Sequence, residues 1–153
     1  MTMAAGAMAT FRERLTSALE THPGLPRTVR DDGRSIEVEF PKQVASGFDV
    51  SLDVSDAEMR LETDRGWHEY WADPTAQDVE HVLGLVRDML STACRLRERR
   101  AGRRAYRWDL ESFVDGHWRQ DGTTGLLFWN YFGRRSEQVY QNDTLPARAL
   151  SST

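Results

Sequence analysis

A chain of 153 residues in which 39% of the side chains are hydrophobic and 29% are charged has the size and composition of one soluble globular domain, and not of a disordered chain. It contains no apolar run near the roughly 20 residues of a membrane-spanning helix. Its first ten residues lack the basic start and long apolar stretch of a signal peptide. The single cysteine, Cys94, excludes an internal disulfide and fits a reducing compartment, so we expect a cytoplasmic protein.

Charge divides the chain into an acidic first half and a weakly basic second half. Residues 1–75 carry 8 basic and 14 acidic side chains, whereas residues 76–153 carry 12 basic and 10 acidic ones. The overall charge of −4 argues against a general nucleic-acid-binding protein, because a negative surface repels phosphates. All basic residues except Lys42 are arginines, which can bind a carboxylate or a phosphate through two parallel hydrogen bonds.

A first helix is predicted to begin at Thr10, because Thr10 and Glu13 have the spacing of a capping box. Apolar residues follow at helical spacing: Phe11, Leu15, Ala18 and Leu19. The sequence His22-Pro23-Gly24 ends this helix, so we interpret His22 as a helix-end residue and not as a ligand. Asp32-Gly33 then predicts a hairpin turn.

Three segments alternate apolar and polar residues, at positions 36–40, 48–54 and 59–63. This alternation predicts strands with one buried face, which is typical of antiparallel sheets. We interpret the carboxylates of the other face as solvent-facing residues and not as a site: Glu37, Glu39, Asp49 and Asp53.

The segment Gly66–Trp71 continues the third strand and concentrates aromatic side chains beside a histidine and a glutamate. If the strand runs straight through Gly66, then Trp67, Glu69 and Trp71 face the core. If Gly66 forms a bulge, His68 and Tyr70 point inward instead. We interpret the segment chiefly as core with one aromatic side chain exposed. Four of its residues are candidates for a pocket or a surface site: Trp67, His68, Glu69 and Trp71.

A long helix is predicted over residues 74–100, with Asp73 as its N-cap, Pro74 at its first position and Gly102 just beyond its end. Its apolar stripe consists of Val79, Val82, Leu83, Val86, Met89, Leu90, Ala93 and Leu96. His81 lies outside the stripe and is interpreted as a solvated residue. Cys94 lies at the border of the stripe and is interpreted as an unreactive buried residue.

Strands are predicted again after Gly102. Residues 106–111 alternate, and the sequence Val-Asp-Gly-His at 114–117 predicts a two-residue hairpin turn that places Phe113 opposite Trp118. Strict alternation then requires a bulge near Ser112. Residues 126–132 are apolar on both faces and predict a central strand, and a final strand runs through Val139 and Tyr140.

Arginines cluster at the predicted end of the long helix and in the loop beyond it. The cluster consists of Arg95, Arg97, Arg99, Arg100, Arg103, Arg104 and Arg107, with Glu98 as the single acid. The helix dipole favours a few cations at this end, but seven repelling guanidinium groups favour an acidic partner. Six of them are candidates for partner binding: Arg95, Arg99, Arg100, Arg103, Arg104 and Arg107. A helix of this length spans roughly 40 Å, so the cluster and the aromatic segment are predicted at opposite ends of the domain.

The chain contains no Gly-rich phosphate loop, no His or Cys pair at zinc spacing and no Gly-x-Ser-x-Gly elbow. We therefore expect no metal, no cofactor and no covalent nucleophile. The elements predict a single α+β domain, a curled antiparallel sheet of six or seven strands in the order α-βββ-α-ββββ, with one long helix packed across it. This domain is placed at residues 10–142, between a flexible N-terminus (1–9) and a flexible C-terminal tail (143–153).

Three functions are compatible with these features. The first hypothesis is a non-enzymatic intracellular binding protein, of the adaptor or immunity type, that engages a protein with an acidic surface through an arginine-rich, aromatic-containing surface. The second is a small-molecule-binding protein or enzyme with a pocket between the sheet and the long helix. The third is RNA binding through the Arg95–Arg107 cluster, which the acidic overall charge disfavours.

Overall fold

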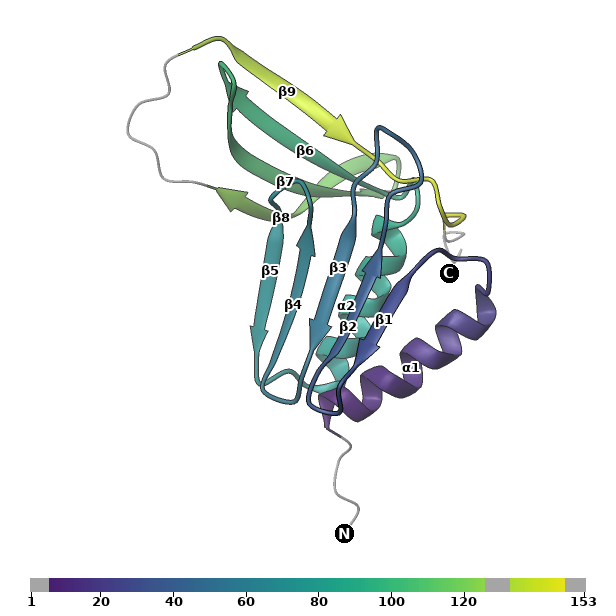
Figure 1. Cartoon of the computed structure of the whole chain (residues 1–153). Helices are drawn as coiled ribbons and strands as arrows, with labels where there is room; N and C mark the ends of the chain where they lie inside the picture. The colour runs from purple at the N-terminus through teal and green to yellow at the C-terminus, as the bar shows by residue number, and fades with distance from the viewer. Residues whose placement is uncertain (1–5, 126–132, 148–153) are drawn as a thin grey trace.

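Two antiparallel sheets and two helices make up the part of the chain that the computed structural model describes, residues 6–125 and 133–147 (Figure 1). One sheet has five strands in the order β1-β2-β3-β4-β5, and the other has four in the order β8-β7-β6-β9. The prediction of an α+β fold with antiparallel strands is confirmed. The prediction of one curled sheet with six or seven strands is wrong, because the described residues form nine strands in two sheets.

The five-stranded sheet is a meander formed by the first half of the chain. Its strands are β1 (Thr28–Asp31), β2 (Ile36–Phe40), β3 (Val50–Val54), β4 (Glu58–Thr63) and β5 (His68–Ala72). The predicted hairpin at Asp32-Gly33 joins β1 to β2. The predicted third strand is split in two by a turn at Gly66, whose φ of 108° reverses the chain so that β5 pairs with β4. Gly66 is therefore a turn residue and not a bulge.

The four-stranded sheet is formed by β6 (Cys94–Ala101), β7 (Arg104–Val114), β8 (His117–Gly125) and β9 (Arg135–Tyr140). The predicted hairpin joins β7 to β8, with φ of 51° at Asp115 and 77° at Gly116. Phe113 lies opposite Trp118 as predicted, and their ring centroids are 5.1 Å apart. The register between β7 and β8 shifts between Leu110 and Glu111, close to the bulge predicted near Ser112. The final strand is confirmed as β9, whereas the predicted strand at 126–132 lies outside the described residues.

The long helix is shorter than predicted at both ends. α2 spans Ala76–Met89, and its N-cap is Thr75, which forms a capping box with Asp78. Asp73 is not the cap, because it has a φ of 48° in the turn before the helix. Residues 94–101 form β6 and not the last turns of a helix, since buried and half-buried residues alternate with a period of two from Cys94. The apolar residues of this stretch fit the helical period of 3.6 as well as the strand period of two, and arginine has a high helix propensity. The helix was therefore predicted to continue through it.

The first helix, α1, spans Ala7–Thr21 and begins three residues earlier than the predicted capping box at Thr10. Its first turn is held by tertiary contacts, because Ala7 is buried and the Met8 amide donates to the Asp56 carboxylate at 3.0 Å. His22 ends the helix as predicted, and its amide donates to the Ala18 carbonyl at 3.2 Å.

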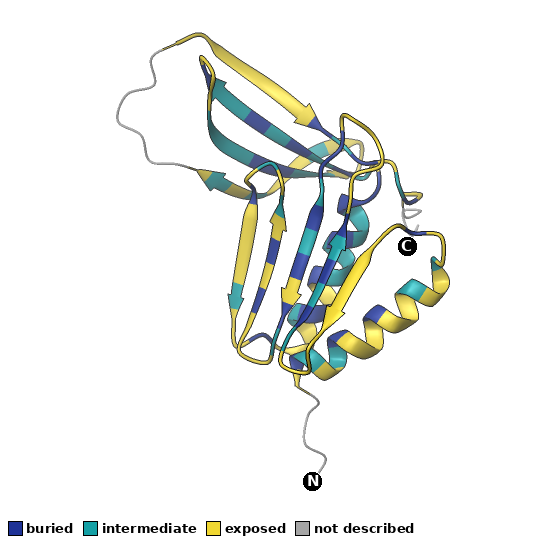
Figure 2. Cartoon of the chain, in the orientation of Figure 1, coloured by how far each residue is buried: buried dark blue, intermediate teal, exposed yellow. Residues whose placement is uncertain are grey.

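The core lies between the five-stranded sheet, the two helices and the inner face of the four-stranded sheet. In Figure 1, α2 runs behind the five-stranded sheet and α1 lies beside β1. Figure 2 shows buried and less buried residues alternating along the inner strands, while β1, β5 and β9 are largely exposed. Leu96 and Leu110 join the core from the four-stranded sheet. Neither described helix is long and apolar enough to cross a bilayer.

Candidate functional site

The outer face of the four-stranded sheet combines arginines, carboxylates and exposed apolar side chains. Residues that lie directly opposite each other on paired strands share a face, and the register pairs Arg95 with Glu111, Arg97 with Asp109 and Arg99 with Arg107. Both helices lie on the side of the other sheet in Figure 1, so neither covers this surface. We call it the arginine–aromatic face, and it consists of Arg95, Arg97, Arg99, Arg107, Asp109, Glu111, Phe113, Trp118, Glu137 and Val139.

The arginines of this face are neutralised by carboxylates of their own chain, which corrects the prediction of a cluster of repelling charges. The shortest N–O distances are 2.5 Å for Arg95–Glu111, 3.1 Å for Arg97–Glu137, 3.2 Å for Arg99–Asp109 and 2.8 Å for Arg107–Asp109. The acids come from β7 and β9, which pair with β6 on either side. With four arginines and three carboxylates, the face carries a net charge of only about +1.

Asp109 anchors this ladder of ion pairs from beneath the arginines. Asp109 is only 1% exposed. Burial on its own would raise the pKa of the Asp109 carboxyl, but hydrogen bonds from Thr123 and Arg107 and the charges of Arg107 and Arg99 outweigh it and lower the pKa. The carboxylate therefore stays ionised and holds the two guanidinium groups in fixed positions.

Apolar side chains stand exposed on the same face. Phe113 is 46% exposed and Val139 is 41% exposed. The guanidinium of Arg95 lies over the ring of Trp118, 4.0 Å from its centroid. Sequence reasoning missed these three apolar residues as site residues: it predicted the pairing of Phe113 with Trp118 but could not show which face the pair occupies. Aromatic side chains beside arginine are typical of the energetic centre of protein interfaces.

The six arginines proposed from the sequence do not form one patch. Arg95, Arg99 and Arg107 lie on the arginine–aromatic face, whereas Arg103 and Arg104 lie at the exposed turn between β6 and β7. Arg100 is bound to Glu98 by an ion pair of 2.5 Å. Glu98 is 4% exposed and also accepts a hydrogen bond of 3.1 Å from Trp108 Nε1. Arg100 therefore serves to satisfy a buried carboxylate.

The side chains of the aromatic segment point as in the first alternative, although the chain turns at Gly66 instead of running straight through it. Register pairs place Glu69 opposite Leu61 and Trp71 opposite Met59, so these side chains point toward the core side of the sheet. Trp67 is 1% exposed and Trp71 is half-buried, while the side chains of His68 and Tyr70 are exposed. The interpretation as core with one exposed aromatic agrees with this arrangement, in which Tyr70 is the exposed ring.

The aromatic segment and the arginine-bearing sheet lie side by side, and the prediction that they occupy opposite ends of the domain is wrong. A Cβ built on Gly66 would stand 2.9 Å from Trp108 Cε2, and one built on Gly122 would stand 3.4 Å from Trp67 Cζ2. The hydroxyl of Thr124 in β8 accepts a hydrogen bond from the His68 amide and donates one to the His68 carbonyl, each at 3.1 Å. The prediction failed because the chain turns back after Met89, where a longer helix was expected.

Glu69 lines a polar cleft of about 510 Å³ between β5, α2 and the β7–β8 hairpin. The side chains of His81, Asp88 and Asp121 also line this cleft. Burial raises the pKa of the Glu69 carboxyl, and the charge of His81 lowers it by a smaller amount. The net effect is a raised pKa. His81 is exposed on α2, in agreement with its interpretation as a solvated residue.

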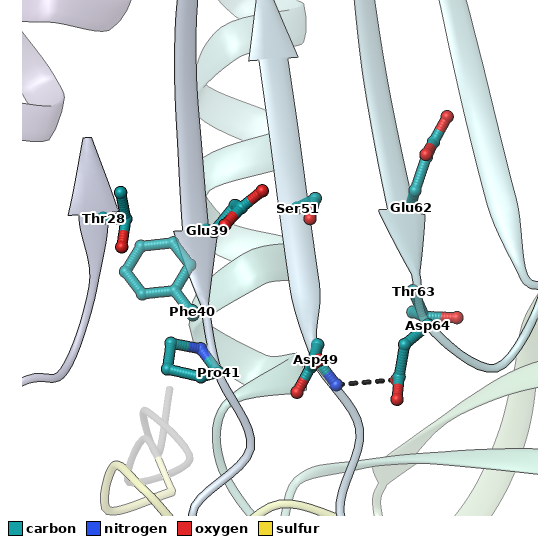
Figure 3. A pocket seen from close by; sticks show the side chains of 9 residues that line it. All are labelled: Thr28, Glu39, Phe40, Pro41, Asp49, Ser51, Glu62, Thr63 and Asp64. Atoms are coloured by element: carbon teal, nitrogen blue, oxygen red, sulfur yellow. Dashed lines mark hydrogen bonds between the residues drawn. The ribbon is translucent and has the colours of Figure 1, made fainter. Parts of the chain in front are cut away.

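The outer face of the five-stranded sheet carries Glu37, Glu39 and Asp53, as predicted, and Asp49 lies at its edge. A shallow hollow of about 290 Å³ lies over it and is lined by Glu39, Asp49, Glu62 and Asp64 among others (Figure 3). Asp64 accepts a hydrogen bond of 2.8 Å from the Asp49 amide, the dashed line in Figure 3, so it has a structural role. Among the described residues, no group of three or more His, Cys, Asp or Glu side chains could hold a metal ion.

Cys94 is fully buried at the start of β6. Burial, with a smaller contribution from the charge of Asp121, raises the pKa of its thiol to about 12. The thiol is therefore protonated and shielded from solvent at neutral pH.

Comparisons of the chain with protein-family models, with curated proteins and with solved structures found no match.

Proposed function

We propose that this protein is a non-enzymatic binding protein, of the adaptor or immunity type, that engages a partner protein through the arginine–aromatic face. The observation that carries the proposal is the exposure of Phe113 and Val139 on a sheet face that also bears Trp118 and a row of arginines. The outer face of an antiparallel sheet is usually polar. Apolar rings in that position lose contact with water only when another molecule covers them.

The ion-pair ladder supports a protein partner over RNA. Asp109, Glu111 and Glu137 lie between the arginines, and a phosphate backbone that approached the guanidinium groups would also meet these carboxylates. A protein surface can place apolar side chains over Phe113 and hydrogen-bond acceptors at the arginine edges. Because the ladder already fixes the guanidinium groups, binding costs little additional side-chain entropy.

An acidic surface on the partner is supported by the turn between β6 and β7. Arg103 and Arg104 are exposed there, and Arg134 is exposed next to them, since its carbonyl accepts from the Gly102 amide at 2.9 Å. Exposed charges of one sign at the rim of an interface accelerate association with a partner of the opposite sign more than they increase its affinity. The proposed interface thus has an apolar centre near Phe113 and a basic rim at this turn.

The test compares two variants that differ in the face they alter. The first carries Phe113→Ser and Val139→Ser. The matched control carries Val29→Ser and Val44→Ser, which remove side chains of similar exposure, 44% and 41%, from the first half of the chain. Each is immobilised beside the wild type, and proteins captured from a lysate of the source cells are quantified by mass spectrometry.

A partner of the arginine–aromatic face will be captured by the wild type and by the control and will be reduced at least about tenfold on the first variant. Both variants are expected to melt within a few degrees of the wild type, because the altered side chains are largely exposed. If no protein depends on Phe113 and Val139, or if the control loses the same proteins, the proposal is wrong.

A further inference from the structure

A small apolar groove lies between the two helices, away from the arginine–aromatic face. α1 and α2 pack against each other there, and the groove has a volume of about 170 Å³. Its walls are mainly aliphatic and aromatic, with Leu15, Leu19, Phe40, Leu83, Val86 and Leu145 among them. No Asp or Glu is among the described residues that line it, although the chain carries 24 acidic residues.

Among the described residues that line this groove, Arg87 is the one arginine, and His22 is the other residue with an ionisable side chain. It lies in the last turn of α2, and its Nε is buried without a hydrogen-bond partner. Arg65 and Arg97 also have a buried Nε without an acceptor, but their guanidinium groups form ion pairs with Asp64 at 3.9 Å and Glu137 at 3.1 Å. Among the described residues, the Arg87 side chain has no carboxylate partner to match these, and its Nε–H is left without an acceptor. A buried donor without an acceptor is costly and favours a ligand that brings one.

We propose that this groove binds a small amphipathic anion, a medium-chain carboxylate whose tail enters between α1 and α2 and whose carboxylate pairs with Arg87. The apolar walls favour the tail, and a guanidinium in a lining without carboxylates favours the anionic head. A cavity of about 150 Å³ holds one benzene ring, so a groove of about 170 Å³ accommodates a tail of about six to eight carbons.

The first experiment measures the affinity of the full-length chain for butanoate, hexanoate and octanoate by NMR titration. Affinity should rise about fourfold for each added methylene until the groove is filled, which corresponds to the transfer free energy of one methylene. Hexan-1-ol, which has the same tail without the charge, should bind at least about tenfold more weakly than hexanoate. The largest shifts should fall on Leu19, Leu83 and the Nε–H of Arg87.

The second experiment separates the charge from the apolar walls. Arg87→Met keeps an unbranched apolar stem, and it should weaken hexanoate at least about tenfold while changing hexan-1-ol less than about twofold. Arg103→Met removes an arginine from the distant β6–β7 turn and should change neither affinity. The mapping of shifts on the wild type does not depend on either variant being folded.

Three results would overturn the proposal. The first is that the wild type binds hexanoate no more tightly than hexan-1-ol. The second is that the hexanoate affinity is unchanged by Arg87→Met. The third is that sedimentation shows a dimer which Leu19→Ser dissociates, because the groove is then an interface between two copies. The Phe113 and Val139 variants should bind hexanoate as the wild type does, so that failure here and failure of the proposed partner-binding function are distinguishable.

Discussion

Gly66 lies directly against the indole of Trp108, and this contact joins the turn before β5 to the middle of β7. A Cβ at Gly66 would stand 2.9 Å from Trp108 Cε2, a distance at which the ring would have to move. Trp108 is also held by a hydrogen bond, since its Nε1 donates to buried Glu98 at 3.1 Å. The indole is thus fixed between the two sheets, and only glycine fits at position 66.

Gly66→Ala is therefore expected to lower the free energy of unfolding by about 2–4 kcal/mol, through positive φ and overpacking together. Gly33→Ala is the matched control: Gly33 also has a positive φ, 83°, but nothing lies within 4 Å of a Cβ built there. The control should lose only about 1 kcal/mol. Urea denaturation measures both values, and equal losses would contradict the role assigned to the Trp108 contact.

Trp67 and Trp71 are expected to differ in their contribution to stability. Trp67 is 1% exposed and packs on Gly122 of the other sheet, whereas Trp71 is half-buried at the edge of the core. Trp67→Ala should cost about 3–5 kcal/mol. Trp71→Ala should cost clearly less, because part of its ring is already in water. Urea denaturation of both variants tests the order, and an equal or larger loss for Trp71→Ala would contradict it.

The strands of the first sheet could be predicted because their pattern depends only on local sequence. β2 and β3 each place apolar residues at every second position, and each has one buried face. The boundary after Met89 could not be predicted in the same way. Leu96 continues the helical stripe as well as it fits the strand that begins at Cys94, and the choice is made by pairing with β7 and β9.

The candidate site was only half visible in the sequence. The arginines of β6 stand out as a cluster, but the acids that neutralise them are far away along the chain: Glu111 is 16 residues from Arg95 and Glu137 is 40 residues from Arg97. The exposure of Phe113 could not be predicted from the sequence either. The hairpin signal fixes its cross-strand partner, whereas the face it occupies depends on where the other sheet packs.

Glu69→Gln is expected to stabilise the protein at neutral pH. Burial raises the pKa of the Glu69 carboxyl above its ordinary value of 4.5, so the folded state binds that proton more tightly than the unfolded state. The ionised form therefore destabilises the fold above the raised pKa, and this penalty disappears as the pH falls below 4.5.

The measurement is the melting temperature of wild type and Glu69→Gln between pH 7 and pH 4. The variant should melt higher at pH 7, and the difference should shrink toward pH 4. Glu39→Gln, on the outer face of the same sheet, serves as the control for the loss of one negative charge from this sheet. A Glu69→Gln variant less stable than the wild type at pH 7 would show that the carboxylate has a favourable partner.

Cys94 is expected to resist thiol reagents as long as the protein is folded. With a thiol pKa of about 12, only on the order of one thiol in ten thousand is ionised at pH 8, and the side chain is fully buried. Labelling by iodoacetamide should be complete within minutes in denaturant and should be negligible over the same time without it. Rapid labelling of the native protein would indicate that β6 opens locally.

Arg99 and Arg103 are expected to have different roles, although both belong to the cluster seen in the sequence. Arg99 lies 3.2 Å from buried Asp109 and 3.8 Å from Glu137, so Arg99→Glu would place a third negative charge among two carboxylates. It should lower the free energy of unfolding by about 1–3 kcal/mol. Arg103 lies at the exposed β6–β7 turn, and Arg103→Glu should change the free energy of unfolding by no more than about 0.5 kcal/mol.

Arg103→Glu should change the rate of partner binding although it hardly changes stability. With the partner recovered through the arginine–aromatic face, Arg103→Glu should slow association severalfold at low salt and make the rate less sensitive to salt, because an exposed rim charge acts mainly through long-range attraction. Surface plasmon resonance at 50 and 300 mM salt measures both effects, with Arg60→Glu on the five-stranded sheet as a control for net charge. If Arg60→Glu slows association as much as Arg103→Glu, the effect comes from the total charge of the protein and the β6–β7 turn has no part in steering the partner.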